Sequence, residues 1–409
     1  MTKFSLNKDQ QDLIKSLLNF YKSDEQYYLI SGAAGVGKTT CMRHFIQKLN
    51  NSKLKIAFSA PTNKAVAVLK DSTKIKEITY RTIYSLLGLK MMPNGGIKEL
   101  KDIGKNKIQD FDIVVIDEGS MISSVLLEYM ESKIALADVK IIIIGDKEQL
   151  PPVGEIDSPI WKKYPTNYEL TEVMRHQNSI LDFVQSIRKN PKPKFVSPGS
   201  QVIVSEETDF ISKIETIAKA GKFHSGEAKA IAWRNITIDY LNKFIRDSYK
   251  TTKTEDTFTE GDRVIFREPI FLGDIPLAAT DEEGVILSAS VTRHLEYPML
   301  RVWRLVIQLD DGGDEVTALV IHENSQTELN RMLQEFSDSK AWYKFWKLKE
   351  AIHDVTHAYA LTAHRSQGST FPVVFVEAGD IMLNSNIRER TKCLYVACSR
   401  ASRGLIIFP

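Results

Sequence analysis

The stretch YYLISGAAGVGKTTCMRHFIQKL, residues 27–49, decides the fold class of this chain. It opens with an apolar run of strand length, passes through a glycine-rich loop, and ends in a segment with helical periodicity. The loop GAAGVGKTT, residues 32–40, satisfies the pattern G-x-x-x-x-G-K-[ST], whose backbone N–H groups turn inward around phosphates. A strand, a phosphate loop and a helix in this order predict a nucleotide-binding α/β domain.

Apolar runs of the same kind continue downstream. KIAFSA (55–60), DIVVIDE (112–118) and VKIIIIGD (139–146) are typical of buried parallel strands. Segments with helical periodicity follow the expected strands at 27–31 and 55–60. This alternation of strand and helix predicts a doubly wound α/β domain over roughly residues 1–155. Further strand patterns at 229–233, 373–378 and 404–408 indicate a second α/β region.

Two insertions interrupt these regions. Residues 90–109, KMMPNGGIKELKDIGKNKIQ, contain an Asn94–Gly95 turn between extended flanks and predict a small hairpin. From about 258 to 320 the pattern changes to short β segments separated by Gly and Asp turns. That change predicts a small barrel-like all-β module inserted into the second region.

The composition indicates the cellular environment of the protein more clearly than its function. The net charge of +2, from 54 basic and 52 acidic side chains, neither favours nor excludes a nucleic-acid partner. The three cysteines lack zinc-like spacing, and we expect a reduced cytosolic environment without structural disulfides. No apolar run is long enough to cross a bilayer, so we expect a soluble intracellular protein without a membrane partner.

The phosphate loop predicts ATP and Mg²⁺ as the bound cofactors. Lys38 is expected to reach the β- and γ-phosphates, and the hydroxyl of Thr39 is expected to ligate Mg²⁺. The alternative interpretation is a glycine-rich turn with an exposed lysine, which the strand and helix context disfavours. The expected nucleotide-binding residues of this loop are Gly32, Ala33, Ala34, Gly35, Val36, Gly37, Lys38, Thr39 and Thr40.

Acidic and amide side chains follow two of the other expected strands. Asp117 and Glu118 end a strand expected to lie beside the phosphate loop. Asp117 would hold Mg²⁺ through water, and Glu118 would orient and deprotonate the attacking water. Gln149, in IIIIGDKEQLPPV (141–153), would contact the γ-phosphate, with an ordinary surface loop residue as the alternative. Adjacent Asp and Glu favour hydrolysis over transfer to a small acceptor.

Six segments in sequence order resemble the motif series of superfamily 1 (SF1B) DNA helicases, in the RecD-like branch and its Dda-like members in T-even phages. They are GAAGVGKTT, the Asp117–Glu118 pair, GDKEQLPPV, LTEVMR (170–175), ALTAHRSQGST (360–370) and LYVACSRA (394–401). The resemblance covers essentially the whole chain. It implies ATP-driven 5′→3′ movement along single-stranded DNA with unwinding of duplex, in DNA replication, recombination or repair.

The resemblance also implies the domain organisation. It predicts two RecA-like parallel-sheet P-loop domains, a small hairpin insertion called 1B and an SH3-like β-barrel insertion called 2B. The expected boundaries are 1–155 for domain 1A with 90–108 as 1B, 156–257 and 353–409 for domain 2A, and 258–352 for 2B.

Further ATP-site residues follow from matching each motif to this sequence. Gln10 resembles the glutamine that reads adenine, and Arg175 and Arg400 resemble arginine fingers that stabilise charge on the γ-phosphate. Gln367 and Gly368 are expected where the two RecA-like domains close on the nucleotide.

DNA contacts are implied in the same way. Thr62 and Asn63 would bind phosphates, and Tyr84 stands where the family usually has a histidine. The hairpin occupies the position of a strand-splitting pin, with Met92 or Ile97 as a wedge or as hairpin packing. The expected DNA-binding residues are Pro61, Thr62, Asn63, Tyr84, Ile97, Thr362, His364, Trp342 and Trp346.

Trp342 and Trp346 lie four residues apart and are expected to share a helical face. Two roles remain open for them, a structural brace between the barrel and the core or direct stacking on bases.

Two alternative functions remain open. The chain could be a single-strand translocase that displaces bound proteins and unwinds little, or a single-strand-binding module with a vestigial ATPase. The expected partners are single-stranded and forked duplex DNA, and then a single-stranded-DNA-binding protein or replisome components. The expected state is a monomer in the cytoplasm of a bacterial cell, with the gene carried by the cell or by a phage.

Overall fold

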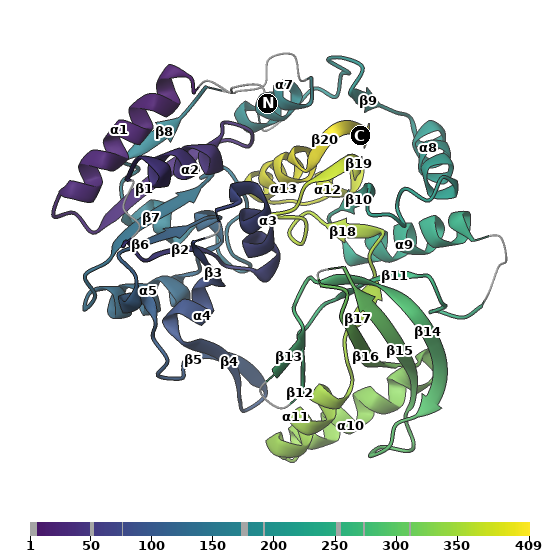
Figure 1. The fold of residues 1–409 in the computed structure, drawn as a ribbon. Coiled ribbons are helices and arrows are strands. Elements are labelled where there is room, and N and C mark those ends of the chain that lie inside the picture. The colour runs from purple at the N-terminus through teal and green to yellow at the C-terminus, as the bar shows by residue number, and fades with distance from the viewer. Residues whose placement is uncertain are drawn as a thin grey trace. The chain divides into compact units, whose positions relative to one another are not determined.

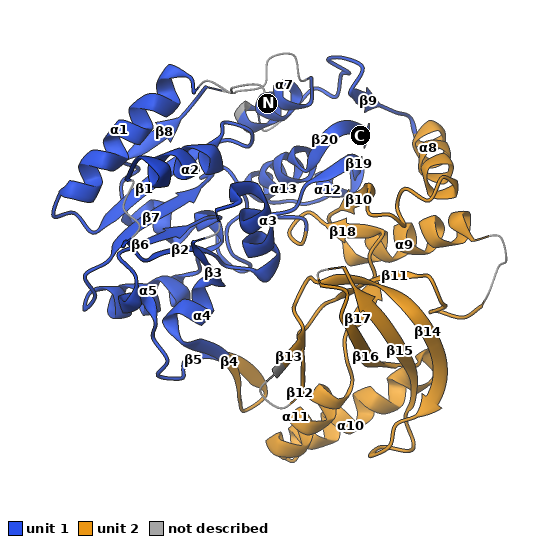
Figure 2. Cartoon of the chain, viewed as in Figure 1, with its two compact units in different colours: residues 1–90, 100–206, 366–409 blue, residues 91–99, 207–365 orange. Residues whose placement is uncertain are grey.

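The computed structural model describes residues 6–49, 53–75, 77–172, 179–190, 193–250, 255–272, 275–310 and 312–409. The chain divides into two compact units, which Figure 2 colours separately. Unit 1 comprises residues 1–90, 100–206 and 366–409, and unit 2 comprises residues 91–99 and 207–365. Each unit therefore contains segments that lie far apart in the sequence (Figure 1).

Unit 1 contains a six-stranded parallel sheet with the strand order β3-β2-β6-β7-β1-β8. Its strands are β1 (Tyr27–Gly32), β2 (Ile56–Ala60), β3 (Thr79–Thr82), β6 (Ile113–Ile116), β7 (Lys140–Gly145) and β8 (Tyr168–Leu170). The apolar runs at 27–31, 55–60, 112–118 and 139–146 therefore contain parallel strands, as the sequence predicts. The carboxyl ends of the strands share one edge, where ligands bind in open α/β sheets.

Both faces of this sheet are covered, which explains the uninterrupted apolar strands. Ile142 and Ile144 belong to a core formed with α1, α2 and α3. The alternate residues Ile141 and Ile143 belong to the opposite core, with α4, α5 and α6. The helices that cover the two faces are α1 (Lys8–Lys22), α2 (Lys38–Leu49), α3 (Asn63–Thr73), α4 (Ile83–Leu87), α5 (Ser124–Ile134) and α6 (Pro159–Lys163).

The remaining elements of unit 1 include three parallel strands in the order β19-β20-β9. They are β9 (Val202–Val204), β19 (Phe371–Glu377) and β20 (Ala401–Phe408). The helices are α7 (Ser179–Lys189), α12 (Ala378–Met382) and α13 (Ile387–Ser399), with short 3₁₀ turns η1 (Ile108–Asp110) and η2 (Gly119–Met121).

The expected hairpin is formed by β4 (Leu89–Asn94) and β5 (Ile97–Asp102). The two residues between the strands are Gly95 and Gly96, so Asn94 ends the first strand where the sequence predicted it within the turn. Gly95 has φ of +58°, a conformation that glycine adopts without a steric penalty. The tip of the hairpin, residues 91–99, belongs to unit 2.

Unit 2 contains a second set of parallel strands, β10 (Ala228–Ala232) and β18 (Ala360–Thr362), which pair directly. The helices α8 (Glu207–Lys219) and α9 (Asn235–Tyr249) accompany them. The parallel strands of both units confirm an α/β protein with more than one parallel sheet.

The expected all-β module is an antiparallel sheet in the order β16-β15-β14-β11-β17, and a core of aromatic and β-branched side chains stabilises it. Its last strand follows residue 352, so the sheet extends beyond the expected range of 258–352. The strands are β11 (Arg263–Phe266), β14 (Glu283–Arg293), β15 (Arg301–Leu309), β16 (Glu315–Ile321) and β17 (Val355–His357), with a separate hairpin of β12 (Ile270–Leu272) and β13 (Ile275–Ala278). The 3₁₀ turn η3 (Glu323–Ser325) and the helices α10 (Gln326–Asp338) and α11 (Trp342–Ala351) follow β16.

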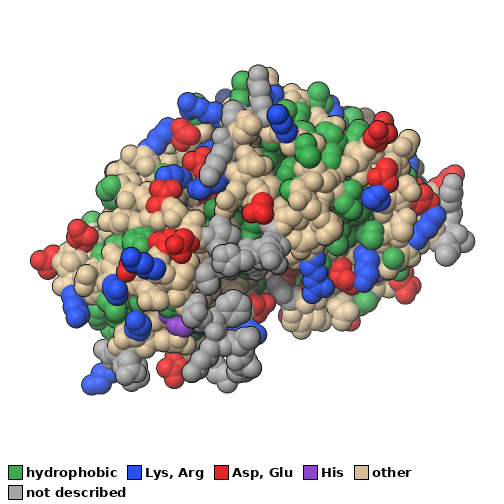
Figure 3. Space-filling view, turned by 90° about the horizontal axis from the view of Figure 1, so that it is seen from above, with side chains coloured by type: hydrophobic (Ala, Val, Ile, Leu, Met, Phe, Trp, Pro, Cys, Tyr) green, Lys and Arg blue, Asp and Glu red, His purple; other side chains and the backbone are tan. Residues whose placement is uncertain are grey.

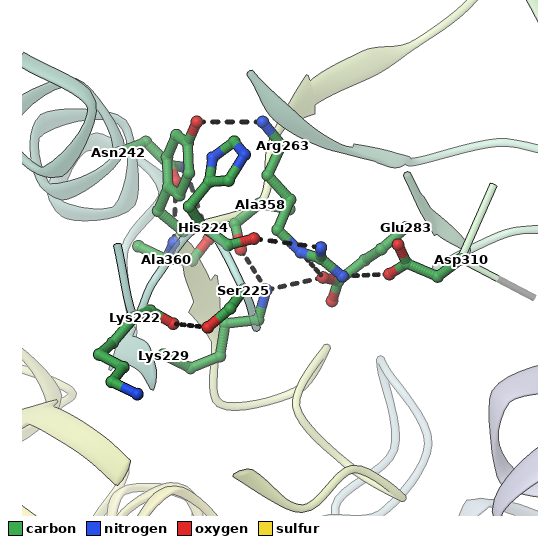
Figure 4. Close-up of polar contacts among 11 residues, drawn as sticks. Lys222, His224, Ser225, Lys229, Asn242, Arg263, Glu283, Asp310, Ala358 and Ala360 are labelled. Atoms are coloured by element: carbon green, nitrogen blue, oxygen red, sulfur yellow. Dashed lines mark hydrogen bonds and ion pairs between the residues drawn. The ribbon is translucent and has the colours of Figure 1, made fainter. Parts of the chain in front are cut away.

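A network of buried ion pairs lies where this sheet meets β10 (Figure 4). Lys229 is fully buried, and its ammonium donates to Glu283 at 2.8 Å and to the carbonyl of Ala358. Arg263 donates to the same carboxylate at 3.0 Å and pairs with Asp310. Glu283 therefore balances two cations in the interior, which buried charges require.

On the face shown in Figure 3, Lys and Arg side chains are interspersed with Asp and Glu. Among the described residues, no helix combines the length and apolar character needed to span a membrane. Cys41, Cys393 and Cys398 are free and buried.

Candidate functional site

The phosphate loop connects β1 to α2 and is shaped by its glycines. Gly35 and Gly37 have φ of +82° and +85°, which L side chains rarely adopt. A Cβ at Gly32 would lie 2.9 Å from Cγ2 of the buried Val36. Lys38 begins α2, and its ammonium donates to the carbonyls of Gly32 at 2.7 Å and Ala33 at 3.0 Å. The loop therefore curls around its own lysine at the amino end of a helix, where anions bind.

The acidic pair lies at the carboxyl end of β6. In the sheet, β7 lies between this strand and β1, which leads into the phosphate loop. The positive charge of Lys38 acts on both carboxyl groups, and by itself it would lower their pKa values. Burial outweighs Lys38 and raises the pKa of Asp117, and burial together with the Asp117 charge raises the pKa of Glu118 to about 7. The neighbouring cationic side chains therefore do not balance the two carboxyl groups. The pair could provide oxygen ligands for a bound metal cation.

Glu118 has an unusual backbone conformation. Its φ and ψ are +53° and +42°, in the left-handed region, and its N–H donates to Oδ1 of Asp117 at 2.8 Å. A non-glycine residue there costs roughly 1–3 kcal/mol, and such strain is concentrated at functional sites. The conformation directs two successive acidic side chains from one strand end.

The loop after β7 contributes Asp146 and Gln149, both buried. The N–H of Gln149 donates to the carbonyl of Asp146 at 3.0 Å. The side-chain Oε1 of Gln149 is buried and has no hydrogen-bond partner in the described part of the chain. Buried amide oxygens are normally satisfied, so this atom is available to a ligand or water at the site.

The last part of the chain adds residues from more than 200 positions downstream. Arg400 is 5% exposed, and its charge acts on Glu118 and partly opposes the rise in the pKa of that carboxyl. Its Nη1 donates to the carbonyl of Ser369 at 3.2 Å. Gln367 donates to the carbonyl of Leu150 at 3.2 Å. A Cβ at Gly368, whose φ is +71°, would lie 4.0 Å from Oε1 of Glu118.

Gln10 lies at the start of α1 and is fully buried. Its Nε2 donates to the carbonyl of Val36 at 3.0 Å, and its Oε1 accepts from the N–H of Asn7. The residue therefore contacts the phosphate loop directly. Its role as the reader of adenine stays a prediction. Arg175 lies outside the described residues.

Tyr395, Asp146 and Arg188 also belong to this site, although the sequence alone gave none of them a role. Tyr395 on α13 accepts a hydrogen bond from the N–H of Ala34 at 3.3 Å and donates to Asp146. Arg188 on α7 donates to the other oxygen of Asp146 at 3.1 Å. The available signal was weak, since a tyrosine within LYVACSRA and an acid after a strand are both common. Their convergence depends on contacts between remote segments.

The DNA-binding residues expected in unit 1 follow strands of the parallel sheet. Pro61 is buried and Asn63 is exposed, while the hydroxyl of Thr62 accepts from the N–H of Ala65 at 3.2 Å and caps α3. Tyr84 is partly buried against the sheet core, and burial raises its pKa. Their contacts with DNA stay predictions.

In unit 2, Thr362 ends β18, and its hydroxyl accepts from the N–H of Arg365 at 3.3 Å. His364 is partly exposed in the turn that follows. Met92 and Ile97 are 40% and 61% exposed at the hairpin tip. All four positions are accessible enough for a contact with DNA, which stays a prediction.

Trp342 and Trp346 both lie on α11, which confirms the expected helix. Trp346 is buried, and its indole N–H donates to the carbonyl of Gly95. The ring of Trp342 lies against Gly96. The two tryptophans therefore contact the hairpin tip. The two roles expected for them, a brace between barrel and core or stacking on bases, stay predictions.

The fold and this site define a P-loop ATPase. A family model described as an AAA domain matches residues 5–216, and one described as a UvrD-like helicase C-terminal domain matches residues 357–408. The chain belongs to the Pif1/RecD/Dda-like family of SF1B ATP-dependent DNA helicases.

Two curated relatives align over nearly their whole length with nearly the whole of this chain. The chain is 28% identical to the uncharacterized protein R530 of Acanthamoeba polyphaga mimivirus, over 98% of this chain and 99% of that protein. It is 24% identical to the ATP-dependent DNA helicase dda of Enterobacteria phage T4, over 98% of each. A crystal structure of Pif1 helicase from Bacteroides in complex with ADP-AlF3 and ssDNA has the same fold, with a TM-score of 0.56, 16% identity, and coverage of 99% of this chain and 92% of that one.

Proposed function

We propose that this protein uses ATP hydrolysis to move 5′→3′ along single-stranded DNA and to separate duplex DNA ahead of it. The observation that carries the proposal is the convergence of Lys38, Glu118 and Arg400 in one site, although they come from three remote segments. Together they are the groups needed to bind a triphosphate, activate water and neutralise the charge that develops on the γ-phosphate. The polarity rests on membership of the family alone.

ATP hydrolysis assigns a separate task to each group. Lys38 would exchange its two carbonyl partners for phosphate oxygens, and the amides at the start of α2 would hold the same phosphates. Glu118, with its raised pKa, is suited to accept a proton from the attacking water. Gln149, whose Oε1 has no hydrogen-bond partner among the described residues, would contact the γ-phosphate. Arg400, and Arg175 by resemblance, would stabilise the transition state.

The residues at the site also fit Mg²⁺. The hydroxyl of Thr39 and the carboxylate of Asp117 are the oxygen ligands that Mg²⁺ prefers, and the metal would neutralise phosphate charge there. The raised pKa of Asp117 supports this assignment, since a nearby cation would favour the ionised carboxylate.

Movement along DNA requires two DNA-binding surfaces whose affinities for DNA change with the state of the bound nucleotide. One DNA-binding surface would be formed by Pro61, Thr62, Asn63 and Tyr84. A second would be formed by Thr362 and His364. A ligand shifts a conformational equilibrium only by its difference in affinity for the two states. ATP must therefore increase the affinity of one DNA-binding surface relative to that of the other. Hydroxyl, amide and imidazole groups suit sequence-independent backbone contacts.

Strand separation is assigned to the hairpin. Its tip carries the exposed apolar side chains Met92 and Ile97. Trp346 of α11 contacts the tip through a hydrogen bond from its indole N–H to the carbonyl of Gly95. An apolar tip can insert between bases at low desolvation cost. Residues 90–108 would then serve as insertion 1B within the proposed RecA-like domain 1A, and 258–352 as an SH3-like insertion 2B within the proposed RecA-like domain 2A.

The biological setting follows the same proposal. The partners would be single-stranded and forked DNA, then a single-stranded-DNA-binding protein or replisome components, during replication, recombination or repair. The protein would act as a monomer in the cytoplasm.

Unwinding of matched duplexes with either a 5′ or a 3′ single-stranded tail, with and without ATP, tests this function. We expect ATP-dependent separation of the 5′-tailed duplex, and Lys38→Ala should abolish it while retaining ATP-independent DNA binding. Separation of the 3′-tailed duplex alone would contradict the polarity. ATP-driven displacement of a bound protein without strand separation would favour the translocase, and DNA binding without ATPase would favour the vestigial module.

A further inference from the structure

Tyr395 connects two parts of the ATP site through one hydroxyl group. Its side chain is 1% exposed on α13. The hydroxyl accepts from the N–H of Ala34 in the phosphate loop at 3.3 Å and donates to Oδ2 of Asp146. Burial and the nearby Asp146 charge both raise the pKa of Tyr395, so the phenol stays protonated and keeps donating.

Asp146 extends this connection to the loop that carries Gln149. Its Oδ1 accepts from the N–H of Glu148 at 3.1 Å and from Arg188 at 3.1 Å. Its backbone carbonyl accepts from the N–H of Gln149 at 3.0 Å and from the hydroxyl of Ser120 at 2.5 Å. All polar atoms of the buried Asp146 side chain are thus engaged, and they order the loop around it.

The same helix carries Arg400 directly after its last residue. Arg400 donates through Nε to the carbonyl of Val396 at 3.1 Å, which ties the guanidinium to the end of α13. A helix behaves as a rigid rod over one or two turns, so Tyr395 and Arg400 move together. A displacement of α13 relative to the phosphate loop would therefore also displace Arg400 from Glu118.

We propose that Tyr395 is a positioning residue for ATP hydrolysis, whose hydroxyl holds the phosphate loop and the Asp146 loop in register with the helix that carries Arg400. The inference rests on the proposed function and adds the residue that aligns its parts. Lys38 and the amides at the start of α2 do not depend on this hydroxyl, so ATP binding should survive its loss. Hydrolysis requires Glu118, Gln149 and Arg400 to be aligned at the same time, so the rate of the chemical step should fall.

The test compares Tyr395→Phe with a matched variant, Tyr359→Phe, in the full chain. Tyr359 is also 1% exposed, and its hydroxyl accepts a backbone N–H, that of Arg263 at 3.0 Å, in unit 2. We expect Tyr395→Phe to lower kcat of the DNA-stimulated ATPase about tenfold while KM for ATP changes less than about twofold. Tyr359→Phe should change neither constant by more than about twofold, even if its thermal stability falls equally.

Three results would overturn the proposal. They are an unchanged kcat in Tyr395→Phe, a rise of KM without loss of kcat, and an equal kcat loss in Tyr359→Phe. The double variant Tyr395→Phe with Asp146→Asn tests the path. If the hydroxyl acts through Asp146, the double variant should lose little more than the worse single one, and multiplied losses would contradict that path. A wild-type chain without ATPase would refute the proposed function itself, whereas an active wild type with an active Tyr395→Phe refutes only this inference.

Discussion

Trp346 donates its indole N–H to the carbonyl oxygen of Gly95 at 2.5 Å, although 251 positions separate the two residues in the chain. Next to this bond, Lys98 at the hairpin tip pairs with Glu268 at 2.8 Å and lies over the Trp346 ring. Pro93 and Gly95 line a cavity of about 440 Å³ together with three aromatic residues of α11. The hairpin tip is therefore held by polar, ionic and aromatic contacts within unit 2.

Trp346→Phe removes this donor and keeps an aromatic ring. One hydrogen bond contributes about 1 kcal/mol, so the equilibrium constant between the ordered and the displaced tip should shift about fivefold toward the displaced tip. We expect duplex unwinding to slow by up to about fivefold while the ATPase stimulated by single-stranded DNA stays within about twofold of wild type. Tyr343→Phe on the same helix, 80% exposed, is the control and should unwind normally. A parallel loss of ATPase and unwinding would contradict a role confined to the tip.

Glu118→Gln keeps the shape of the side chain and removes the proton acceptor. We expect kcat for ATP to fall by roughly 10²- to 10⁴-fold, the usual contribution of general base catalysis. Binding of a fluorescent ATP analogue should persist, since Lys38 and the loop amides remain. Glu128→Gln on the exposed face of α5 serves as the control. Hydrolysis at the wild-type rate in Glu118→Gln would refute the assignment of the base.

Glu283→Gln should destabilise the protein strongly, because it leaves the fully buried Lys229 beside a neutral side chain. Removing one member of a buried ion pair costs about 3–5 kcal/mol. Lys229→Met should cost less, since Glu283 keeps Arg263 at 3.0 Å. Chemical unfolding of both variants measures the difference. Glu215→Gln, in an exposed pair with Lys219, should be indistinguishable from wild type. The reverse order of the two buried variants would contradict the charge balance drawn in Figure 4.

Asp262 should make stability depend on pH in the acid range. The side chain is fully buried, and burial would raise its pKa, but His357, Lys250 and Arg246 outweigh burial and hold the pKa well below its usual value. A depressed folded-state pKa stabilises the fold above the unfolded-state pKa of about 3.9, and this contribution is lost as pH falls below that value.

Urea unfolding of wild type and Asp262→Asn between pH 3 and 7 tests this dependence. The difference in unfolding free energy between the two proteins should be constant above about pH 5 and should shrink below about pH 4. A difference that stays constant down to pH 3 would show that Asp262 does not titrate in this way.

The sequence by itself determined the features that depend on neighbouring residues. A phosphate loop is a local feature, because its glycines, its lysine and the start of the helix that follows lie within nine positions. Strands covered on both faces are continuously apolar, so 27–31 and 139–146 were recognisable without knowing their partners. The order of motifs that identifies the family can likewise be read along the chain.

Only the tertiary structure decided what depends on contacts between remote segments. Sequence places Asp117 at a strand end but does not say that β7 separates β6 from β1. Two tryptophans on one helical face are compatible with many neighbours, and only the fold directs Trp346 to Gly95. Tyr395 gains its place in the ATP site only because α13 packs near Ala34 and Asp146. Periodicity records which side of an element is buried, whereas the identity of the partner across a core is set by the packing of the whole chain.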